Sequence, residues 1–289
     1  MRLFLLTALT MLAFAANSIL NRMALAAGDI DAMGFAVIRV ASGAAILVAM
    51  ALIQRRRLPL MAPGRITGAL SLCLYLVGFS VAYMRLDAGL GALILFGCVQ
   101  ITMFAGAVIA GETVPRPRWI GAGVALIGLG WLVWPAGAVQ VPLLGTLFMA
   151  LAGAGWGVYS LAGRKSGDPL AATAANFLLA LPVCVAAALL LPGVAEPAAI
   201  TLRGVLLACV AGAVTSGLGY ALWYSVLPRL DSSIAGLVQL TVPVIALLGG
   251  IVLLGEGVSL RLAAAGAVVL GGIAYGLAAP QRRIGSSGS

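Results

Sequence analysis

Long apolar stretches separated by short polar connections make up most of the chain. A helix that crosses the hydrocarbon core of a bilayer needs about 20 mostly apolar residues. Ten stretches of that size lie near residues 3–25, 32–53, 66–84, 89–110, 118–134, 144–163, 170–191, 204–226, 232–254 and 260–278. The connections between them leave no room for a soluble domain. The pattern predicts an all-α membrane protein with ten transmembrane helices.

Composition supports this class and excludes others. Hydrophobic residues make up 63% of the 289 residues and charged residues only 9%, whereas soluble domains are about one quarter charged. The net charge of +9 does not gather on one face as nucleic-acid binding requires, so no nucleic-acid partner is expected. There is no His, and the four Cys have no metal-ligand spacing. We therefore expect no metal and no cofactor.

The distribution of basic residues predicts the orientation in the membrane. Lys and Arg are enriched in cytoplasmic loops. With ten spans, twelve basic residues fall on the side of the two termini and four on the opposite side. Arg55, Arg56 and Arg57, followed by Arg65, form the largest cluster and suit a loop beside anionic lipid headgroups. Both termini are predicted to be cytoplasmic.

The two halves of the chain repeat each other. Arg85-Leu86-Asp87 recurs as Arg229-Leu230-Asp231, and Gly111-Glu112 recurs as Gly255-Glu256, both at an offset of 144 residues. Chance matches of charged residues are improbable because such residues are few. Each repeat holds five predicted spans, an odd number, so the second repeat is inverted, as in many secondary transporters. The predicted units are 1–139, 140–280 and a basic tail, 281–289, which ends in a Gly/Ser sequence typical of a cloning remnant.

These motifs resemble a known family. Ten spans in two halves, each with a Leu-Asp…Gly-Glu pattern around its fourth helix, resemble the drug/metabolite transporter superfamily in its EamA-type branch. Phe35–Ala41 is similar to that family's pattern at the start of the second span. The resemblance implies a bacterial inner-membrane, multi-pass transporter. Overall similarity to the YddG-type exporters further implies export of aromatic and other neutral amino acids. Drugs, nucleotide sugars or lipid-linked sugars, carried elsewhere in the superfamily, are the alternative substrates.

Polar residues inside the predicted spans are candidates for substrate binding. Arg39 is the one charged residue well inside a span. An arginine there is costly in lipid, so it either docks an anionic substrate group, snorkels to the interface or bonds backbone carbonyls. The mid-span amides could grip a zwitterion or bridge helices. These amides are Asn17, Gln100, Asn176 and Gln239.

Aromatic residues away from the span ends could line a pocket for a flat substrate. Tyr75 and Phe79 share one helical face with Tyr83. Trp156 and Tyr159 lie in the sixth span, and Tyr220 lies in the eighth with Trp223 and Tyr224. The substrate-binding candidates are Tyr75, Phe79, Trp156, Tyr159 and Tyr220. By contrast, Tyr83, Tyr224, Trp131 and Trp134 lie where interfacial aromatic residues are common.

Four acids at span ends are candidates for gates or helix caps. Asp87 and Asp231 precede predicted helices, where a side chain can cap the free amides. Glu112 and Glu256 follow helices, where an acid opposes the helix dipole, so each should cap the next helix or pair with an arginine. The predicted topology places Glu112 and Asp231 on the cytoplasmic face, and Asp87 and Glu256 on the outer face.

Missing motifs narrow the function further. The chain has no phosphate-binding GxxxxGK[ST] loop for ATP and no acid in mid-span for a proton relay. It has no catalytic constellation, so we expect no enzyme. Facilitated diffusion, or coupling through the interface acids, fits the sequence better than a pump driven by a carboxylate deep in the membrane. Gly272 and Gly276 form a GxxxG pattern that favours close helix packing and leaves a homodimer through the tenth span open.

Overall fold

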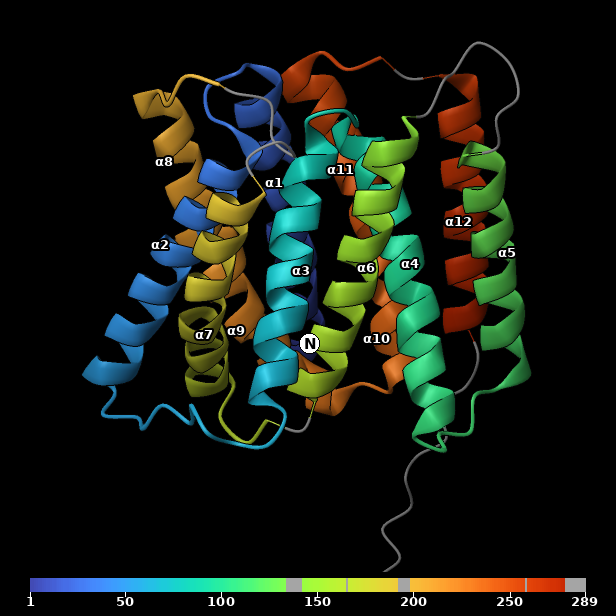
Figure 1. The fold of residues 1–289 in the computed structure, drawn as a ribbon. Coiled ribbons are helices and arrows are strands. Elements are labelled where there is room, and N and C mark those ends of the chain that lie inside the picture. Colours follow the sequence, from blue (N-terminus) through green and yellow to red (C-terminus); the bar gives the residue numbers. More distant parts are fainter. Residues whose placement is uncertain (134–141, 165, 192–197, 258, 279–289) are drawn as a thin grey trace, which may run out of the picture.

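The protein is a bundle of helices, seen in the computed structural model of Figure 1. The structure describes residues 1–289 except 134–141, 165, 192–197, 258 and 279–289. The predicted tail, 281–289, and the boundary between the predicted repeats at 139/140 therefore lie outside the described residues. Within the described part, every regular element is helical. The apolar stretches explain this, because a backbone in hydrocarbon must satisfy its own hydrogen bonds.

The helices follow the ten apolar stretches closely. They are α1 (Arg2–Ala26), α2 (Ala32–Ile53), α3 (Arg65–Tyr83), α4 (Ala88–Ile109), α5 (Arg116–Val133), α6 (Leu143–Gly163), α7 (Pro169–Leu190), α8 (Leu202–Val210), η2 (Ala211–Leu218), α9 (Gly219–Val226), η3 (Leu227–Arg229), α10 (Ser232–Gln239), α11 (Val242–Leu254) and α12 (Leu260–Leu277). Segments α8 to η3 continue one another, as do α10 and α11.

Within the described residues, eight helices are long and apolar enough to cross a membrane, when Leu202–Arg229 and Ser232–Leu254 are each counted as one continuous helix. The chain is thus a multi-pass α-helical membrane protein. The predicted fifth and tenth spans correspond to α5 and α12, which are only 18 residues each and are not among the eight. The number of ten crossings stays a prediction.

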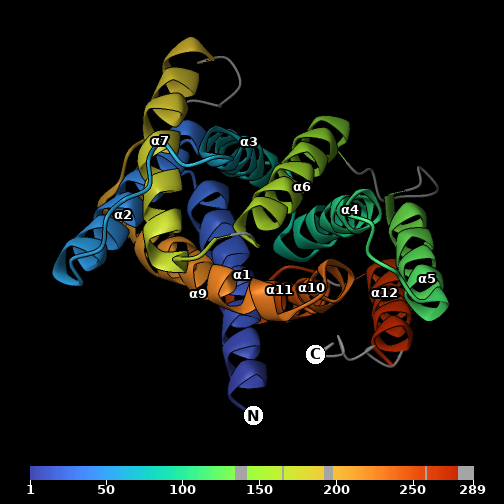
Figure 2. The same cartoon turned by 90° about the horizontal axis from the view of Figure 1, so that it is seen from below.

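The helices run between two ends of the bundle that carry the connections (Figure 1). α1 crosses the interior and packs against α11, η2 and α9, while α3 packs on α6, and α6 on α4. α2 lies against α7 and η2. The α5–α12 pair stands at one edge of the bundle in both views (Figures 1 and 2).

The helical backbone breaks from regular α-helix at two places near the bundle centre. Residues 211–218 form a π-helix between α8 and α9, and such segments often occur at functional sites. The second break separates α10 from α11 at Leu240 and Thr241, with Pro243 in the first turn of α11. Proline cannot donate a backbone hydrogen bond inside a helix, which favours a break just before it. The break makes Gln239 the last residue of α10.

The GxxxG pattern packs α12 against α5 within the chain. A Cβ on Gly272 would lie 2.5 Å from the Gly121 carbonyl oxygen, and a Cβ on Gly121 would lie 2.9 Å from the Gly276 nitrogen. Such close backbone approach requires glycine. The GxxxG motif therefore packs two helices of the same chain against each other, so it no longer supports a homodimer. The homodimer stays a prediction.

Replacing Gly272 with Ala should lower the free energy of unfolding in detergent, because the added methyl group meets backbone atoms of α5. Overpacking of this kind costs about 1–3 kcal/mol. Gly271→Ala is the matched control, since a Cβ there has no neighbour within 4 Å and gains the same helix propensity. Equal melting temperatures for the two variants would contradict the assigned packing.

Candidate functional site

Arg39 on α2 is the centre of a buried polar cluster. Its Nε donates to Ser216 Oγ at 2.8 Å, and its Nη2 donates to the hydroxyls of Tyr75 and Tyr220 at 2.9 and 2.6 Å. The guanidinium carbon lies 4.9 Å from the centre of the Phe79 ring. The Arg39 side chain is fully buried. It therefore does not snorkel to the interface, which was one of the alternatives for this residue.

No acidic side chain of the described residues forms an ion pair with Arg39. The guanidinium is held by neutral hydroxyl groups and by the faces of aromatic rings, a cation–π arrangement. Its Nη1 atom is buried and has no hydrogen-bond partner among the described residues. A charge in this setting is unbalanced, and burying such a charge costs several kcal/mol.

The amide of Asn17 on α1 extends the same cluster. Its Nδ2 donates to the Tyr220 and Tyr75 hydroxyls at 3.1 and 3.3 Å, and its Oδ1 accepts from Thr215 Oγ1 at 3.0 Å. Helices α1, α3, η2 and α9 thus meet at a single network with Arg39. The network is a strong constraint because each polar group in the interior needs a partner.

Trp156 and Gln239 form the neighbouring part of the site. Trp156 Nε1 on α6 donates to Gln239 Oε1 at 2.6 Å, where α10 ends. The Trp156 ring centre lies 4.5 Å from that of Tyr220, 5.0 Å from that of Tyr75 and 5.4 Å from that of Tyr159. The structure therefore brings eight of the ten predicted substrate-binding residues together. They are Asn17, Arg39, Tyr75, Phe79, Trp156, Tyr159, Tyr220 and Gln239.

The close approach of the π-helix η2 to α2 completes the cluster, and it depends on one glycine of η2. Thr215 and Ser216 both lie on η2. A Cβ on Gly212 would lie 2.1 Å from the Arg39 carbonyl oxygen and 2.0 Å from Ser42 Oγ, so only glycine allows this approach. Sequence reasoning missed Thr215 and Ser216, because no local pattern distinguishes a π-helix from an α-helix.

Asn176, another predicted residue, lies toward one end of the bundle. Its Oδ1 accepts from Arg65 Nη1 at 3.1 Å, and its Nδ2 donates to the Tyr224 hydroxyl at 3.3 Å. The Tyr224 hydroxyl donates in turn to the Tyr159 carbonyl oxygen at 2.9 Å. These contacts join Asn176 to the central rings.

A cavity of about 290 Å³ adjoins Asn176 at the end of the bundle that carries the α2–α3 and α6–α7 connections. Its walls include Arg65, Ser166, Asn176 and Tyr224. Tyr224 closes the cavity toward Tyr159, and the Tyr224 and Tyr159 ring centres are 4.8 Å apart. The central cluster is thus separated from this cavity by one layer of aromatic rings.

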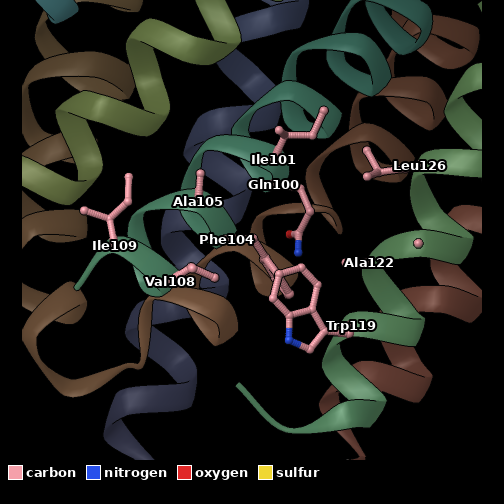
Figure 3. A pocket seen from close by; sticks show the side chains of 10 residues that line it. Gln100, Ile101, Phe104, Ala105, Val108, Ile109, Trp119, Ala122 and Leu126 are labelled. Atoms are coloured by element: carbon pink, nitrogen blue, oxygen red, sulfur yellow. The ribbon is translucent and has the colours of Figure 1, made fainter. Parts of the chain in front are cut away.

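Gln100 is not part of the hydrogen-bonded cluster around Arg39. It is buried on α4 and borders a different pocket, between α4 and α5 (Figure 3). Neither amide atom of its side chain has a hydrogen-bond partner in the described part of the chain.

Arg22 on α1 forms ion pairs with two acids at one end of the bundle. Its Nη2 lies 3.1 Å from Asp87 Oδ1, and its Nε lies 3.3 Å from Glu256 Oε1. Glu256 also accepts from the backbone N–H of Ala88, at 3.1 and 3.0 Å to its two oxygens, and so caps α4. Burial raises the pKa of the Glu256 carboxyl above its ordinary value; Ala88 and Arg22 oppose the rise and Asp87 adds to it.

A corresponding arrangement occurs at the other end. Glu112 accepts from the backbone N–H of Ser232 at 3.2 Å and from Arg164 Nη1 at 2.9 Å, and Arg164 also bonds the Ser232 hydroxyl. Arg118 Nη1 lies 3.0 Å from Asp231 Oδ2. Each glutamate therefore caps a helix and pairs with an arginine.

The expected capping by Asp87 and Asp231 is wrong. Both occupy the N-cap position, of α4 and α10, but neither side chain makes a capping hydrogen bond. Glu256 and Glu112 take that role, which leaves the aspartates to pair with Arg22 and Arg118.

The interfacial assignment of Tyr83 and Tyr224 is also wrong. Both are fully buried, and so is Trp223. Trp131 is exposed as expected, while Trp134 lies outside the described residues. A position near a span end does not reveal which face of the helix a side chain occupies, and only the packing decides it.

Comparison with known proteins places this helical membrane protein in a transporter class. A model of the EamA-like transporter family matches residues 143–276. An uncharacterized protein of Pseudomonas aeruginosa is 48% identical over 277 residues, 96% of this chain and 95% of its own length. A protein of known crystal structure has a similar fold, with a TM-score of 0.67 and 22% identity over 92% of this chain and 96% of its own.

The chain belongs to the EamA-like transporter family. It is a membrane transporter for small molecules and not an enzyme.

Gly212→Ala should destabilise the protein by about 1–3 kcal/mol, because the methyl group pushes η2 away from Arg39 and breaks the bond to Ser216. Gly219→Ala, where the nearest atom is a methyl carbon at 3.3 Å, is the control and should change little. Thermal unfolding in detergent compares them. A Gly212→Ala protein as stable as the control would refute the close approach of α2 and η2.

Proposed function

We propose that this transporter exports neutral amino acids, aromatic ones included, across the bacterial cell membrane. Arg39 and its partners form the midplane binding site, and the two halves of the chain alternate in opening it to either side. The observation that carries the proposal is the buried guanidinium without an acidic partner among the described residues.

The unbalanced charge favours a substrate with an anionic group. A carboxylate accepts two parallel hydrogen bonds from a guanidinium, and Arg39 has Nη1 unpartnered beside Nη2. The Tyr75 and Tyr220 hydroxyls, now bonded to Nη2, can turn to the substrate when a carboxylate displaces them. A substrate carboxylate would thus supply the counter-charge that the fold omits.

The surrounding groups suit the rest of an amino acid. Asn17 Oδ1 and Gln239 Oε1 are neutral acceptors for an ammonium group. Trp156, Tyr159, Tyr220 and Phe79 offer ring faces to a flat side chain. Because no acid faces the cluster within the described residues, the ammonium group is recognised without a second buried charge. This combination favours a zwitterion over a dianion such as a phosphate ester.

The cavity beside Asn176 supports access from the cytoplasm. Its end of the bundle carries the basic loops Arg55–Arg57 and Arg65, which the charge distribution predicts to be cytoplasmic. Tyr224 separates it from Tyr159 and the other rings of the central cluster. Rotation of the Tyr224 side chain would connect the cavity to the central cluster and admit substrate for export.

The exchanged caps support two inverted halves, 1–139 and 140–280. Glu256 of the second half caps Ala88 of the first, and Glu112 of the first caps Ser232 of the second. Both Ala88/Ser232 and Glu112/Glu256 are 144 residues apart. The two contacts lie at opposite ends of the bundle, as an inverted repeat requires. We propose that they hold the outer and inner gates, with Asp87 and Asp231 beside them.

Proteoliposomes should take up labelled phenylalanine and tryptophan in a saturable way, without a pH gradient. Arg39→Gln should reduce this uptake at least tenfold, since the carboxylate loses its partner. Phenethylamine, which is phenylalanine without the carboxylate, should not compete. Competition by phenethylamine as strong as that by phenylalanine would rule out carboxylate recognition. A requirement for a pH gradient would instead favour coupling through the interface acids.

The gate pairs should show coupled effects on transport. Arg164→Gln and Glu112→Gln should each change the uptake rate, and the double variant should change it by less than the two together, a coupling of about 0.5–3 kcal/mol. Arg22→Gln and Glu256→Gln form the equivalent test at the other end. Arg203→Gln, which breaks an exposed pair with Asp29, is the control and should transport normally. Strict additivity at both ends would remove the gating role.

A further inference from the structure

Polar side chains on α1 continue from the central cluster to the end of the bundle at Arg22. Asn21 follows Asn17 by one helical turn, about 6 Å along the axis, and Arg22 is the next residue. All three donate hydrogen bonds to α3. Their acceptors are the Tyr75 hydroxyl at 3.3 Å, the Ser80 hydroxyl at 3.3 Å and the Tyr83 carbonyl oxygen at 3.0 Å. Polar contacts thus join the two helices at successive levels.

Aromatic rings on α3 follow the same course. Tyr75, Phe79 and Tyr83 are spaced by four residues and share one helical face. Their ring centres are 5.1 and 4.7 Å apart, and all three rings are buried. The inner end of this row lies against Arg39, and its outer end lies at the carbonyl that Arg22 binds. A polar row and an aromatic row therefore connect the central cluster with the outer gate.

Asn21 is the unusual member of the polar row. Its side chain is fully buried, and its Oδ1 has no hydrogen-bond partner among the described residues. The neighbouring Ser18 Oγ is also buried, with no partner in hydrogen-bonding geometry. By contrast, Asn17 Oδ1 already accepts from Thr215. A buried polar atom without a partner destabilises the folded state, and native proteins contain few of them, so Asn21 is a candidate for contact with the substrate.

The free atoms of this pair are oxygens, which defines the group that they bind. An amide oxygen only accepts hydrogen bonds, and a serine hydroxyl can also accept. The ammonium group is the part of a zwitterionic amino acid that donates hydrogen bonds. Farther along α1, the carboxylates of Asp87 and Glu256 surround Arg22. Acceptors for an ammonium group therefore follow one another from the central cluster to the outer gate.

We propose that Asn21, with Ser18 beside it, is a second binding site for the substrate's ammonium group, between Arg39 and the outer gate. The proposal rests on the amino-acid export proposed above. The amino acid leaves Arg39 with its ammonium group first, and its side chain moves along the rings of Phe79 and Tyr83. In the present conformation the two rows are packed together, and the passage opens when the ion pairs of Arg22 separate.

Asn21→Val is the direct test, because it removes both polar atoms of the side chain. The maximal rate of phenylalanine uptake into proteoliposomes should fall about tenfold. Thermal stabilisation by phenylalanine should equal that of the wild type, since the groups around Arg39 are intact. The melting temperature without substrate should be unchanged or higher, because a buried atom without a partner is removed. A purely structural Asn21 would give the opposite result, a lower melting temperature.

Two further variants make the test specific. Asn21→Thr differs from Asn21→Val by a hydroxyl in place of a methyl group, so it restores an oxygen acceptor and should recover most of the lost rate. Thr10→Val is the matched control on α1. The Thr10 side chain is buried and its hydroxyl bonds the Leu6 carbonyl oxygen at 2.7 Å, so its loss should leave uptake normal. Ser18→Ala, a smaller change beside Asn21, should slow uptake about threefold.

Two results would overturn the proposal while the wild type transports phenylalanine. One is an Asn21→Val rate equal to that of the wild type. The other is an equal loss of rate in Asn21→Val and Asn21→Thr, which would show that the acceptor oxygen has no role. If Asn21→Val does not fold, a Ser18→Ala rate equal to that of the wild type decides against the proposal. A wild type without any amino-acid uptake would instead overturn the proposed function, and this site with it.

Discussion

The central constraint on this structure is a guanidinium group buried in the membrane interior without an acid beside it. A charge at the centre of a transmembrane helix costs about 2.5–3.5 kcal/mol on insertion scales. The fold reduces this cost with neutral groups alone, the hydroxyls of Ser216, Tyr75 and Tyr220 and the faces of two rings. A structural arginine would gain more from a carboxylate of the protein. The arrangement is understandable when the missing counter-charge belongs to the transported molecule.

Several features of the backbone follow from this requirement. The hydroxyl of Ser216 reaches Arg39 because η2 is wound as a π-helix and because Gly212 lets it touch α2. The break between α10 and α11 places Gln239 where Trp156 can bind it. These departures from regular α-helix lie around the site, which is where transporters tolerate irregular backbone. The ends of the bundle are held differently, by arginines that each pair with an acid.

The sequence predicts the helices well and the site in part. Apolar runs define the helices because bilayer thickness fixes their length, so α2 and α4 begin and end within one residue of the expected bounds. Arg39 and Asn17 are recognisable in the sequence because polar residues at mid-span depth are rare, and the structure places both in the buried polar cluster. Gln100 meets the same criterion yet faces another pocket, since depth alone does not specify the helix face. Tyr224 was misjudged for the same reason, and Ser216 was missed because serine is common in apolar helices and no pattern marks a π-helix.

The most direct test of the central claim is the thermal stability of the wild type and of Arg39→Gln, each with and without phenylalanine. If the charge serves the substrate, Arg39→Gln should unfold at the same or a higher temperature than the wild type, and phenylalanine should stabilise only the wild type, as a ligand of the folded state does. A large loss of stability in Arg39→Gln, together with equal stabilisation of both proteins by phenylalanine, would show that Arg39 serves the fold and that the substrate binds elsewhere.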